Sequence, residues 1–245
     1  MNKPIIILGA TSTIARATAM AFAAKGHDLY LAGRDSDEIK RIANDLMIRY
    51  GITALPGNFD AEQFATHEAF FLKSLKECGE LTGVIFACGY MVNGSAATDF
   101  NNAKKIIDVN FTGAVSILNY YANYFASRKQ GFIIGISSVA GDRGRQSNYI
   151  YGSAKGALSL YLQGLRNQLY TFGVRVITIK PGFVDTQMTF GMPGLFLVAS
   201  PEVIGKQIAA SIHKNTDIIY LPWFWRYIMI IIRSIPEWIF KRLKL

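Results

Sequence analysis

The sequence predicts a single α/β domain built on a doubly wound, seven-stranded parallel sheet, and three observations support this prediction. Short apolar runs of strand length alternate with segments of helical period along almost the whole chain. The runs are continuously apolar, which is typical of parallel strands covered by helices on both faces. No linker, internal repeat or low-complexity tract interrupts the alternation, and 245 residues are enough to bury one core.

The first part of the chain contains four strand–helix units. Strands are predicted at residues 4–9, 28–33, 52–55 and 81–89. Helices are predicted at 13–25, from residue 35 onward, at 61–77, and in the stretch that runs to about residue 128. Asp35 and Glu38 have the spacing of a capping box, so Asp35 is expected to start the second of these helices.

The second part adds three strands, at 131–137, 174–182 and 217–221, with helices at about 149–172 and 201–214. Because crossovers between parallel strands of one sheet are right-handed, we expect the helices to cover both faces. The prediction is one domain over residues 1–220, followed by an amphipathic helical tail over residues 221–245.

Composition excludes several classes of function. The formal net charge is +9, but the basic residues are scattered, and no zinc-finger spacing, RNA-binding aromatic motif or basic helix occurs. Nucleic-acid binding is therefore not expected. Cys78 and Cys88 match no metal or redox spacing, and His27, His67 and His213 share no ligand spacing, so we predict no metal site. Few cysteines and the lack of a signal-peptide core indicate a reducing, cytoplasmic location.

The turn after the first strand has features of a dinucleotide site, which in such a sheet lies beyond the carboxyl ends of the strands. Gly9 allows a tight turn. Thr11, Ser12, Thr13 and Ile14 then present hydroxyls and N–H groups at a helix start, where a pyrophosphate is stabilised. The further glycines of the usual fingerprint are missing, so an ordinary strand–turn–helix is the alternative.

The residue after the second strand indicates which dinucleotide is bound. An acidic residue there suits the ribose hydroxyl of NAD, whereas an arginine suits the 2′-phosphate of NADP. The sequence has Arg34 at this point, and a guanidinium pairs well with a phosphate. We therefore predict NADP(H) in preference to NAD(H). A solvated loop arginine is the alternative.

A catalytic set is predicted from Ser138, Tyr151 and Lys155. Tyr151 and Lys155 are four residues apart on a predicted helix and share one face. A free tyrosine has a pKa of about 10, and a cation one turn away favours the phenolate and lowers this pKa. Ser138 follows the fifth strand and is expected to bind the substrate oxygen where charge develops. A packed tyrosine and a strand-ending serine are the alternatives.

On these residues the chain resembles the short-chain dehydrogenases/reductases, over about residues 4–215. The resemblance implies a Rossmann fold and hydride exchange between C4 of a nicotinamide and a carbonyl carbon. It also implies that Tyr151 donates the proton during reduction, that Ser138 polarises the carbonyl, and that Lys155 with Asn110 reloads the proton. A catalytically inactive nucleotide-binding protein is the alternative.

The resemblance assigns further residues to the cofactor. It places Asp60 at the adenine, Thr186 at the nicotinamide end, and Gly89 where the backbone approaches the cofactor, with Tyr151 and Lys155 as further contacts. Asn110 matches the residue that helps to hold a proton-relay water near the lysine. The family's Asn-Asn-Ala-Gly is replaced by Phe-Ala-Cys-Gly at 86–89, which is a departure from the pattern.

The tail over residues 221–245 mixes three tryptophans, an apolar run and five basic residues. Its longest uncharged run between arginines, 227–232, is far shorter than the ~20 residues of a membrane span. Pro222 and Pro236 divide it into two short predicted helices, at about 223–235 and 237–244. Aromatic and basic side chains together favour a helix that lies on a membrane surface. Packing on another subunit, which implies a homo-oligomer, is the alternative.

The tail and segments 137–158 and 173–188 resemble reductases that act on a 2-keto sugar carried by a polyprenyl phosphate. This resemblance implies a lipid-linked carbonyl substrate, met at the inner face of the cytoplasmic membrane, and a partner oxidase. Arg143 and Arg145 are then expected to face the phosphate, with a solvated charged loop as the alternative. A small soluble or free lipid carbonyl is the alternative substrate.

Overall fold

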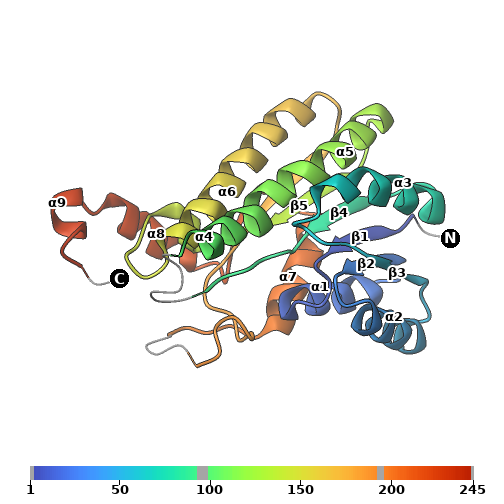
Figure 1. Ribbon diagram of the computed structural model, residues 1–245, viewed down its shortest axis with the longest axis horizontal. Helices are drawn as coiled ribbons and strands as arrows, with labels where there is room; N and C mark the ends of the chain where they lie inside the picture. Colours follow the sequence, from blue (N-terminus) through green and yellow to red (C-terminus); the bar gives the residue numbers. More distant parts are fainter. Residues whose placement is uncertain (1–2, 93–98, 192–195, 244–245) are drawn as a thin grey trace.

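The computed structural model describes residues 3–92, 99–191 and 196–243, and over these residues it confirms the predicted fold. A seven-stranded parallel sheet in the order β3-β2-β1-β4-β5-β6-β7 forms the centre of the molecule (Figure 1). The strands are β1 (Ile5–Leu8), β2 (Leu29–Gly33), β3 (Ala54–Asn58), β4 (Gly83–Phe86), β5 (Phe132–Ile136), β6 (Arg175–Pro181) and β7 (Ile218–Leu221).

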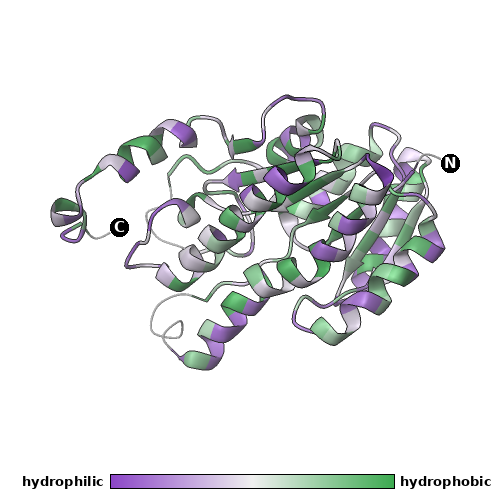
Figure 2. Cartoon of the chain, turned by 90° about the horizontal axis from the view of Figure 1, so that it is seen from above, coloured by the Kyte–Doolittle hydropathy of each residue, from purple (hydrophilic) through white to green (hydrophobic). Residues whose placement is uncertain are grey.

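Helices cover both faces of this sheet (Figure 1). One face carries α1 (Thr13–Ala23), α2 (Ser36–Tyr50) and α7 (Pro201–Ser211). The other face carries α3 (His67–Cys78), α4 (Phe100–Ile107), α5 (Gly113–Arg128) and α6 (Tyr149–Tyr170). Figure 2 shows the strands coloured as hydrophobic, whereas the outer helices alternate between hydrophobic and hydrophilic residues.

The continuously apolar strands are explained by the two cores. Successive side chains of a strand point to opposite faces. In β1, Ile5 and Ile7 pack into the core under α1, α2 and α7, whereas Ile6 and Leu8 pack into the core under α3, α5 and α6. Both faces are therefore buried, and no position of this strand is free to be polar.

Some boundaries differ from the prediction, and three differences have a structural reason or consequence. The third strand extends through Pro56 and Gly57, which is tolerated because β3 lies at the edge of the sheet. The third helix begins only at His67, after a short 3₁₀ turn, η1 (Phe64–Thr66). The long helical stretch is divided by a single π-helical turn, η3 (Asp108–Thr112), which joins α4 to α5.

The tail follows β7 and forms α8 (Trp225–Ser234) and α9 (Glu237–Phe240). Helix α9 ends four residues before the predicted residue 244, which itself lies outside the described residues. Both helices lie at the carboxyl edge, the edge at which the strands end (Figure 1). Within the described residues, no helix has both the length and the apolar character that crossing a membrane requires.

Candidate active site

A cavity of about 300 Å³ opens at the carboxyl edge, where β1 lies between β2 and β4. The chain order reverses at this point, and ligands of doubly wound sheets bind at such a switch point. The walls are formed by the turn after β1, by the segments after β4, β5 and β6, and by the start of α6.

The structure brings Ser138, Tyr151 and Lys155 together in the wall of this cavity. Ser138 continues β5 in an extended conformation, and its Oγ accepts a hydrogen bond of 3.1 Å from the amide of Ala140. Tyr151 and Lys155 lie on the first turns of α6, and the hydroxyl of Tyr151 is hydrogen-bonded to Ser138. Serine and tyrosine hydroxyls thus face the same small space.

A close backbone contact sets the position of Ser138 relative to α6. The 3₁₀ turn η4 (Val139–Asp142) follows Ser138 and packs directly on the helix. A methyl group added at Gly141 would lie 2.6 Å from the amide nitrogen of Gly156, which is closer than any real contact. The close approach of the two backbones therefore requires glycine at position 141, whereas a methyl group at Gly156 would lie 3.0 Å from the carbonyl oxygen of Gly141, a tight contact.

Lys155 is held between the ends of β4 and β5. Its side chain donates to the carbonyl oxygen of Ile136 at 3.0 Å and to that of Cys88 at 3.5 Å. The residue is only 3% exposed, and this burial lowers the pKa of Lys155 to about 8. The ammonium lies 5.9 Å from the centre of the Tyr151 ring, so it shares the pocket with the hydroxyl that must exchange a proton.

The pKa of Tyr151 differs from the expectation. Burial raises it to about 12, and the hydrogen bond with Ser138 opposes this shift. The expected lowering by Lys155 is not what the structure shows, because the ammonium donates to main-chain carbonyls and its own charge is disfavoured by burial. In this state Tyr151 holds its proton at neutral pH, as a proton donor must.

Asn110 lies in the π-helical turn and is fully buried. Its amide donates to the carbonyl oxygens of Tyr90, at 2.6 Å, and Ile106, at 2.8 Å, and its oxygen accepts from the amide of Tyr90 at 3.4 Å. Asn110 thus fixes the segment that contains Gly89. This segment passes between the side chains of Asn110 and Lys155. Single π-helical turns are frequent at functional sites. The contact with a proton-relay water stays a prediction.

The turn after β1 has the donor groups that a pyrophosphate needs. Gly9 has a positive φ of 80°, and a methyl group there would lie 2.8 Å from the amide nitrogen of Cys88. Residues Thr11, Ser12, Thr13 and Ile14 line the cavity at the start of α1. The first N–H groups of a helix have no acceptor within the helix, so they are available to an anion.

Arg34 and Asp60 follow the strands on the outer side of β1 rather than lining the cavity. The Arg34 side chain is 62% exposed, and its contact with Glu62 is long, at 3.9 Å. Asp35 caps α2 as predicted, because its side chain accepts from the amide of Glu38 at 3.0 Å. Asp60 accepts from the amide of Glu62 at 3.0 Å. Arg34 thus remains accessible to a phosphate.

Thr186 lies in the segment after β6. It lines the cavity, and its amide donates to the hydroxyl of Thr189 at 3.1 Å. This contact orders the segment that the family pattern assigns to the nicotinamide end. Together with the α1 start and Arg34, the donor set at this edge fits a phosphorylated dinucleotide.

The two loop arginines point in different directions, although both were expected to face a phosphate. Arg143 points to the tail, where it donates to the carbonyls of Ile232 (3.0 Å), Arg233 (3.0 Å) and Ile235 (2.6 Å) at the end of α8. Its guanidinium also pairs with Glu237 at 2.9 Å. The prediction that Arg143 faces a substrate phosphate is therefore corrected. Its guanidinium is bound by the carbonyls at the C-terminus of α8, an end of a helix that attracts cations.

Arg145, in contrast, lines the cavity. One of its terminal nitrogens lies 3.2 Å from the sulfur of Met229 on α8. Arg145 thus meets both the cavity and the tail.

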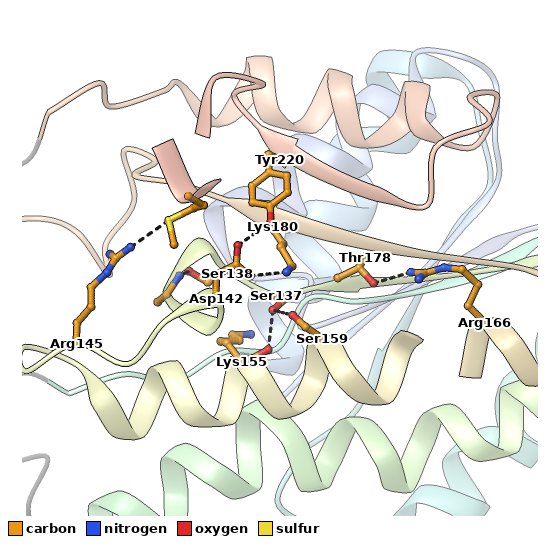
Figure 3. Close-up of polar contacts among 12 residues, drawn as sticks. Ser137, Ser138, Asp142, Arg145, Lys155, Ser159, Arg166, Thr178, Lys180 and Tyr220 are labelled. Atoms are coloured by element: carbon orange, nitrogen blue, oxygen red, sulfur yellow. Dashed lines mark hydrogen bonds and ion pairs between the residues drawn. The ribbon is translucent and has the colours of Figure 1, made fainter. Parts of the chain in front are cut away.

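A buried polar cluster supports this loop, and sequence reasoning missed it. The carboxylate of Asp142 forms an ion pair with Lys180 on β6, and its other oxygen accepts from the hydroxyl of Tyr220 on β7 at 2.7 Å (Figure 3). The cluster ties the segment after Ser138 to two strands. A charged residue inside the apolar sixth strand was the available signal, since a buried lysine needs a partner.

The comparisons with known proteins agree with this geometry. A family model described as short chain dehydrogenase matches residues 3–192. An uncharacterised oxidoreductase of Mycobacterium tuberculosis is 31% identical over 241 residues, covering 98% of this chain and 96% of the relative. An uncharacterised oxidoreductase of Streptomyces coelicolor is 30% identical over 247 residues, with 98% and 96% coverage.

Solved structures share the fold. A short-chain dehydrogenase of Sphingobium yanoikuyae in complex with NADPH has a TM-score of 0.81 at 22% identity, covering 96% of this chain and 97% of that one. An alcohol dehydrogenase of Thermococcus sibiricus complexed with 5-hydroxy-NADP has a TM-score of 0.79 at 23% identity, with 90% and 96% coverage.

The chain belongs to the short-chain dehydrogenase/reductase family. It is accordingly an NAD(P)-dependent oxidoreductase. Within the described residues, no group of three or more histidine, cysteine or acidic side chains is placed to hold a metal ion.

Proposed function

We propose that the chain is an NADPH-dependent ketoreductase that works at a membrane surface on the 2-keto group of a sugar carried by a polyprenyl phosphate. The observation that carries the proposal is the position of the tail. Helices α8 and α9 stand at the same edge as the catalytic cavity, and Met229 of α8 contacts Arg145 in the cavity wall.

The exposed face of the tail supports contact with a membrane. Trp223 is 68% exposed and Trp238 is 62% exposed, and exposed tryptophans are typical of the headgroup region of a membrane interface. Further apolar and basic side chains are exposed in the same tail, namely Tyr227, Ile230, Ile231, Ile239, Arg226, Lys241 and Arg242. Such helices lie in the interfacial plane, and an anionic leaflet attracts the basic residues.

The accessible guanidinium of Arg34 after β2 supports NADP(H) as the cofactor, and NAD(H) is less favoured. Two structures of similar fold contain NADPH and 5-hydroxy-NADP. When bound, the cofactor supplies or accepts the hydride at its nicotinamide. The chain then provides the proton from Tyr151, a hydrogen bond from Ser138 to the substrate oxygen, and a buried cation at Lys155.

The lipid-linked substrate is supported by a resemblance. Segments 137–158, 173–188 and the tail are similar to the reductase subunit of decaprenylphosphoryl-ribose 2-epimerase, which reduces a 2-keto sugar on a polyprenyl phosphate. The prenyl chain of such a substrate stays in the bilayer, so the active site must come to the inner face of the cytoplasmic membrane. A reductase of this kind needs a partner oxidase to form the ketone.

A second candidate is a reductase of a soluble or free lipid carbonyl. The observation in its favour is the same exposed apolar face, because a patch of this kind also suits a subunit interface. In that case the tail serves to form a homo-oligomer rather than to bind a membrane.

The test follows NADPH oxidation at 340 nm in detergent micelles. The protein is offered a polyprenyl-phosphoryl 2-keto-pentose beside a panel of soluble ketones, with Tyr151→Phe as the blank. Turnover of the lipid-linked ketose that depends on Tyr151 is the expected result. Turnover of soluble ketones alone would contradict the proposal and favour the second candidate.

Membrane contact is tested separately by flotation with vesicles of phosphatidylglycerol and phosphatidylcholine. The double variant Trp223→Ala/Trp238→Ala is expected to lose flotation while keeping turnover of any soluble ketone. Leu72→Ala, a change at an exposed apolar residue of α3 outside the tail, is the control. Equal flotation of all three proteins would exclude the tail as the membrane contact.

A further inference from the structure

Arg145 has hydrogen-bond donors that the described residues leave unused. Its Nε is buried and has no hydrogen-bond partner among them. One terminal nitrogen contacts only the sulfur of Met229, and a thioether is a weak acceptor. A buried donor without a partner destabilises the fold and calls for an explanation.

No carboxylate of the described residues forms an ion pair with Arg145. Asp142 is the acid whose charge acts on it, but the oxygens of Asp142 are already taken by Lys180 and Tyr220. Burial lowers the pKa of Arg145, and the charge of Asp142 opposes this shift. The guanidinium is therefore a partly buried cation that has no ion-pair partner among the described residues.

Arg143 provides an internal comparison. It lies two residues away on the same loop, yet it donates to three carbonyls and pairs with Glu237. Its guanidinium also covers the ring of Phe240, with the central carbon 3.9 Å from the ring centre. Unused donors are thus a property of Arg145 itself and not of this loop.

The position of Arg145 is the second observation. It lines the same cavity as Ser138 and Tyr151, on the loop that leads into α6. The dinucleotide phosphates have other partners, at the α1 start and at Arg34. Apolar side chains of Met91, Phe183 and Met188 line the cavity as well, so the space suits a molecule with both an apolar and an anionic part.

We infer that Arg145 recognises an anionic group of the substrate, a phosphate ester, and thereby determines which carbonyl compounds the pocket accepts. This inference rests on the proposed reductase function. A guanidinium binds a phosphate through two parallel hydrogen bonds, which gives both charge and orientation. Arg145 binds the anion beside the reacting carbonyl, whereas Arg143 keeps the tail in place.

Calorimetric titration of the NADP⁺-loaded protein tests this without requiring turnover. Geranyl phosphate and geraniol are the probes, because they differ only in the phosphate. The wild-type protein is expected to bind geranyl phosphate more tightly than geraniol. Arg145→Gln is expected to weaken geranyl phosphate binding by about 10- to 100-fold, the usual range for a hydrogen bond to a charged group. Geraniol binding should change less than about threefold.

Two further variants make the test specific. Arg145→Lys keeps the charge but not the paired donors, and it is expected to recover part of the affinity. Arg128→Gln removes the same charge at the distant end of α5 and should bind like the wild type. Thermal unfolding should show that Arg145→Gln remains folded, because the change removes a buried donor rather than a satisfied one.

The inference is overturned if wild type shows no preference for the phosphate, or if Arg145→Gln binds both probes like Arg128→Gln. A loss of vesicle flotation in Arg145→Gln would also overturn it, because the anion would then be a lipid headgroup. Failure of the proposed function appears elsewhere, as absent turnover of the lipid-linked ketose. A phosphate preference that depends on Arg145 would survive that failure.

Discussion

The catalytic edge and the tail lie side by side but are held in different ways. At the catalytic edge, Lys155 and Asn110 are buried. Lys155 donates to a main-chain carbonyl at the end of β5, and Asn110 donates to main-chain carbonyls after β4 and in α4. In α8 and α9, Trp225, Met229 and Phe240 are buried, and the outer face of both helices is exposed. The comparison teaches that the sheet fixes the positions of the catalytic side chains, whereas a few side-chain contacts hold the tail next to the cavity.

The largest expected effect is at the catalytic edge. Tyr151→Phe removes the proton donor and is expected to lower kcat by about 10³- to 10⁴-fold, toward the upper end of the range for general acid catalysis. Stopped-flow measurement of NADPH oxidation checks this. Flotation of the tail should be unchanged. A loss below tenfold would mean that another group supplies the proton.

The next largest effect concerns the attachment of the tail. Trp225 is 1% exposed and packs on Phe183 and Phe196, so Trp225→Ala is expected to cost about 3–5 kcal/mol at the tail. Limited proteolysis should then cleave within residues 222–236, while the sheet stays resistant. Trp223→Ala is the matched control, since an exposed side chain changes stability by less than about 0.5 kcal/mol. Resistance of both variants would show that the tail is held elsewhere.

The third effect depends on pH and belongs to Lys155. Its pKa is about 8 in the folded chain and 10.5 as a free group, because burial disfavours the charge. Between these values the unfolded chain binds more protons, so stability rises with pH there. We expect the wild type to gain up to on the order of 3 kcal/mol relative to Lys155→Met between about pH 8 and 10.5. Urea unfolding at several pH values measures this. If the difference in unfolding free energy between the two proteins did not change with pH, the pKa of Lys155 would not be lowered by burial.

The smallest effect is at the exposed end of the cofactor site. Arg34→Gln is expected to weaken NADPH binding by about tenfold, because an exposed ion pair with a phosphate is partly screened. NADH binding should stay within about twofold, since NADH has no 2′-phosphate. Fluorescence titration of both cofactors checks the difference. Equal weakening of both would show that Arg34 does not select the cofactor.

The fold could be predicted because its signal is local. Continuously apolar strands and helical periods are visible in the sequence itself. The four consecutive apolar residues Ile5–Leu8, for example, indicate a strand that is buried on both faces. The boundary of β3 could not be predicted, since Pro56 is tolerated only at a sheet edge, and strand order is not local information. The π-helical turn at Asn110 likewise has no local signature.

The site was predicted where chemistry requires particular residue types. Ser138, Tyr151 and Lys155 were named from spacing and do line one cavity. The roles of Arg143 and Arg145 could not be separated, because they differ only in contacts with residues about ninety positions later in the chain. Asp142 was missed for the same reason: its partners come from β6 and β7.

The glycine contact between η4 and α6 has a consequence for mutational tolerance. Gly141 and Gly156 touch neither cofactor nor substrate in the proposed scheme, yet no side chain fits at Gly141. In a saturation screen for activity, Gly141 would appear as intolerant as Tyr151. A parallel screen for protein abundance would separate them, because Tyr151 variants accumulate as folded protein whereas Gly141 variants do not. Loss of activity in such a screen therefore has two different causes within residues 141–151, namely loss of folding at Gly141 and loss of the proton donor at Tyr151.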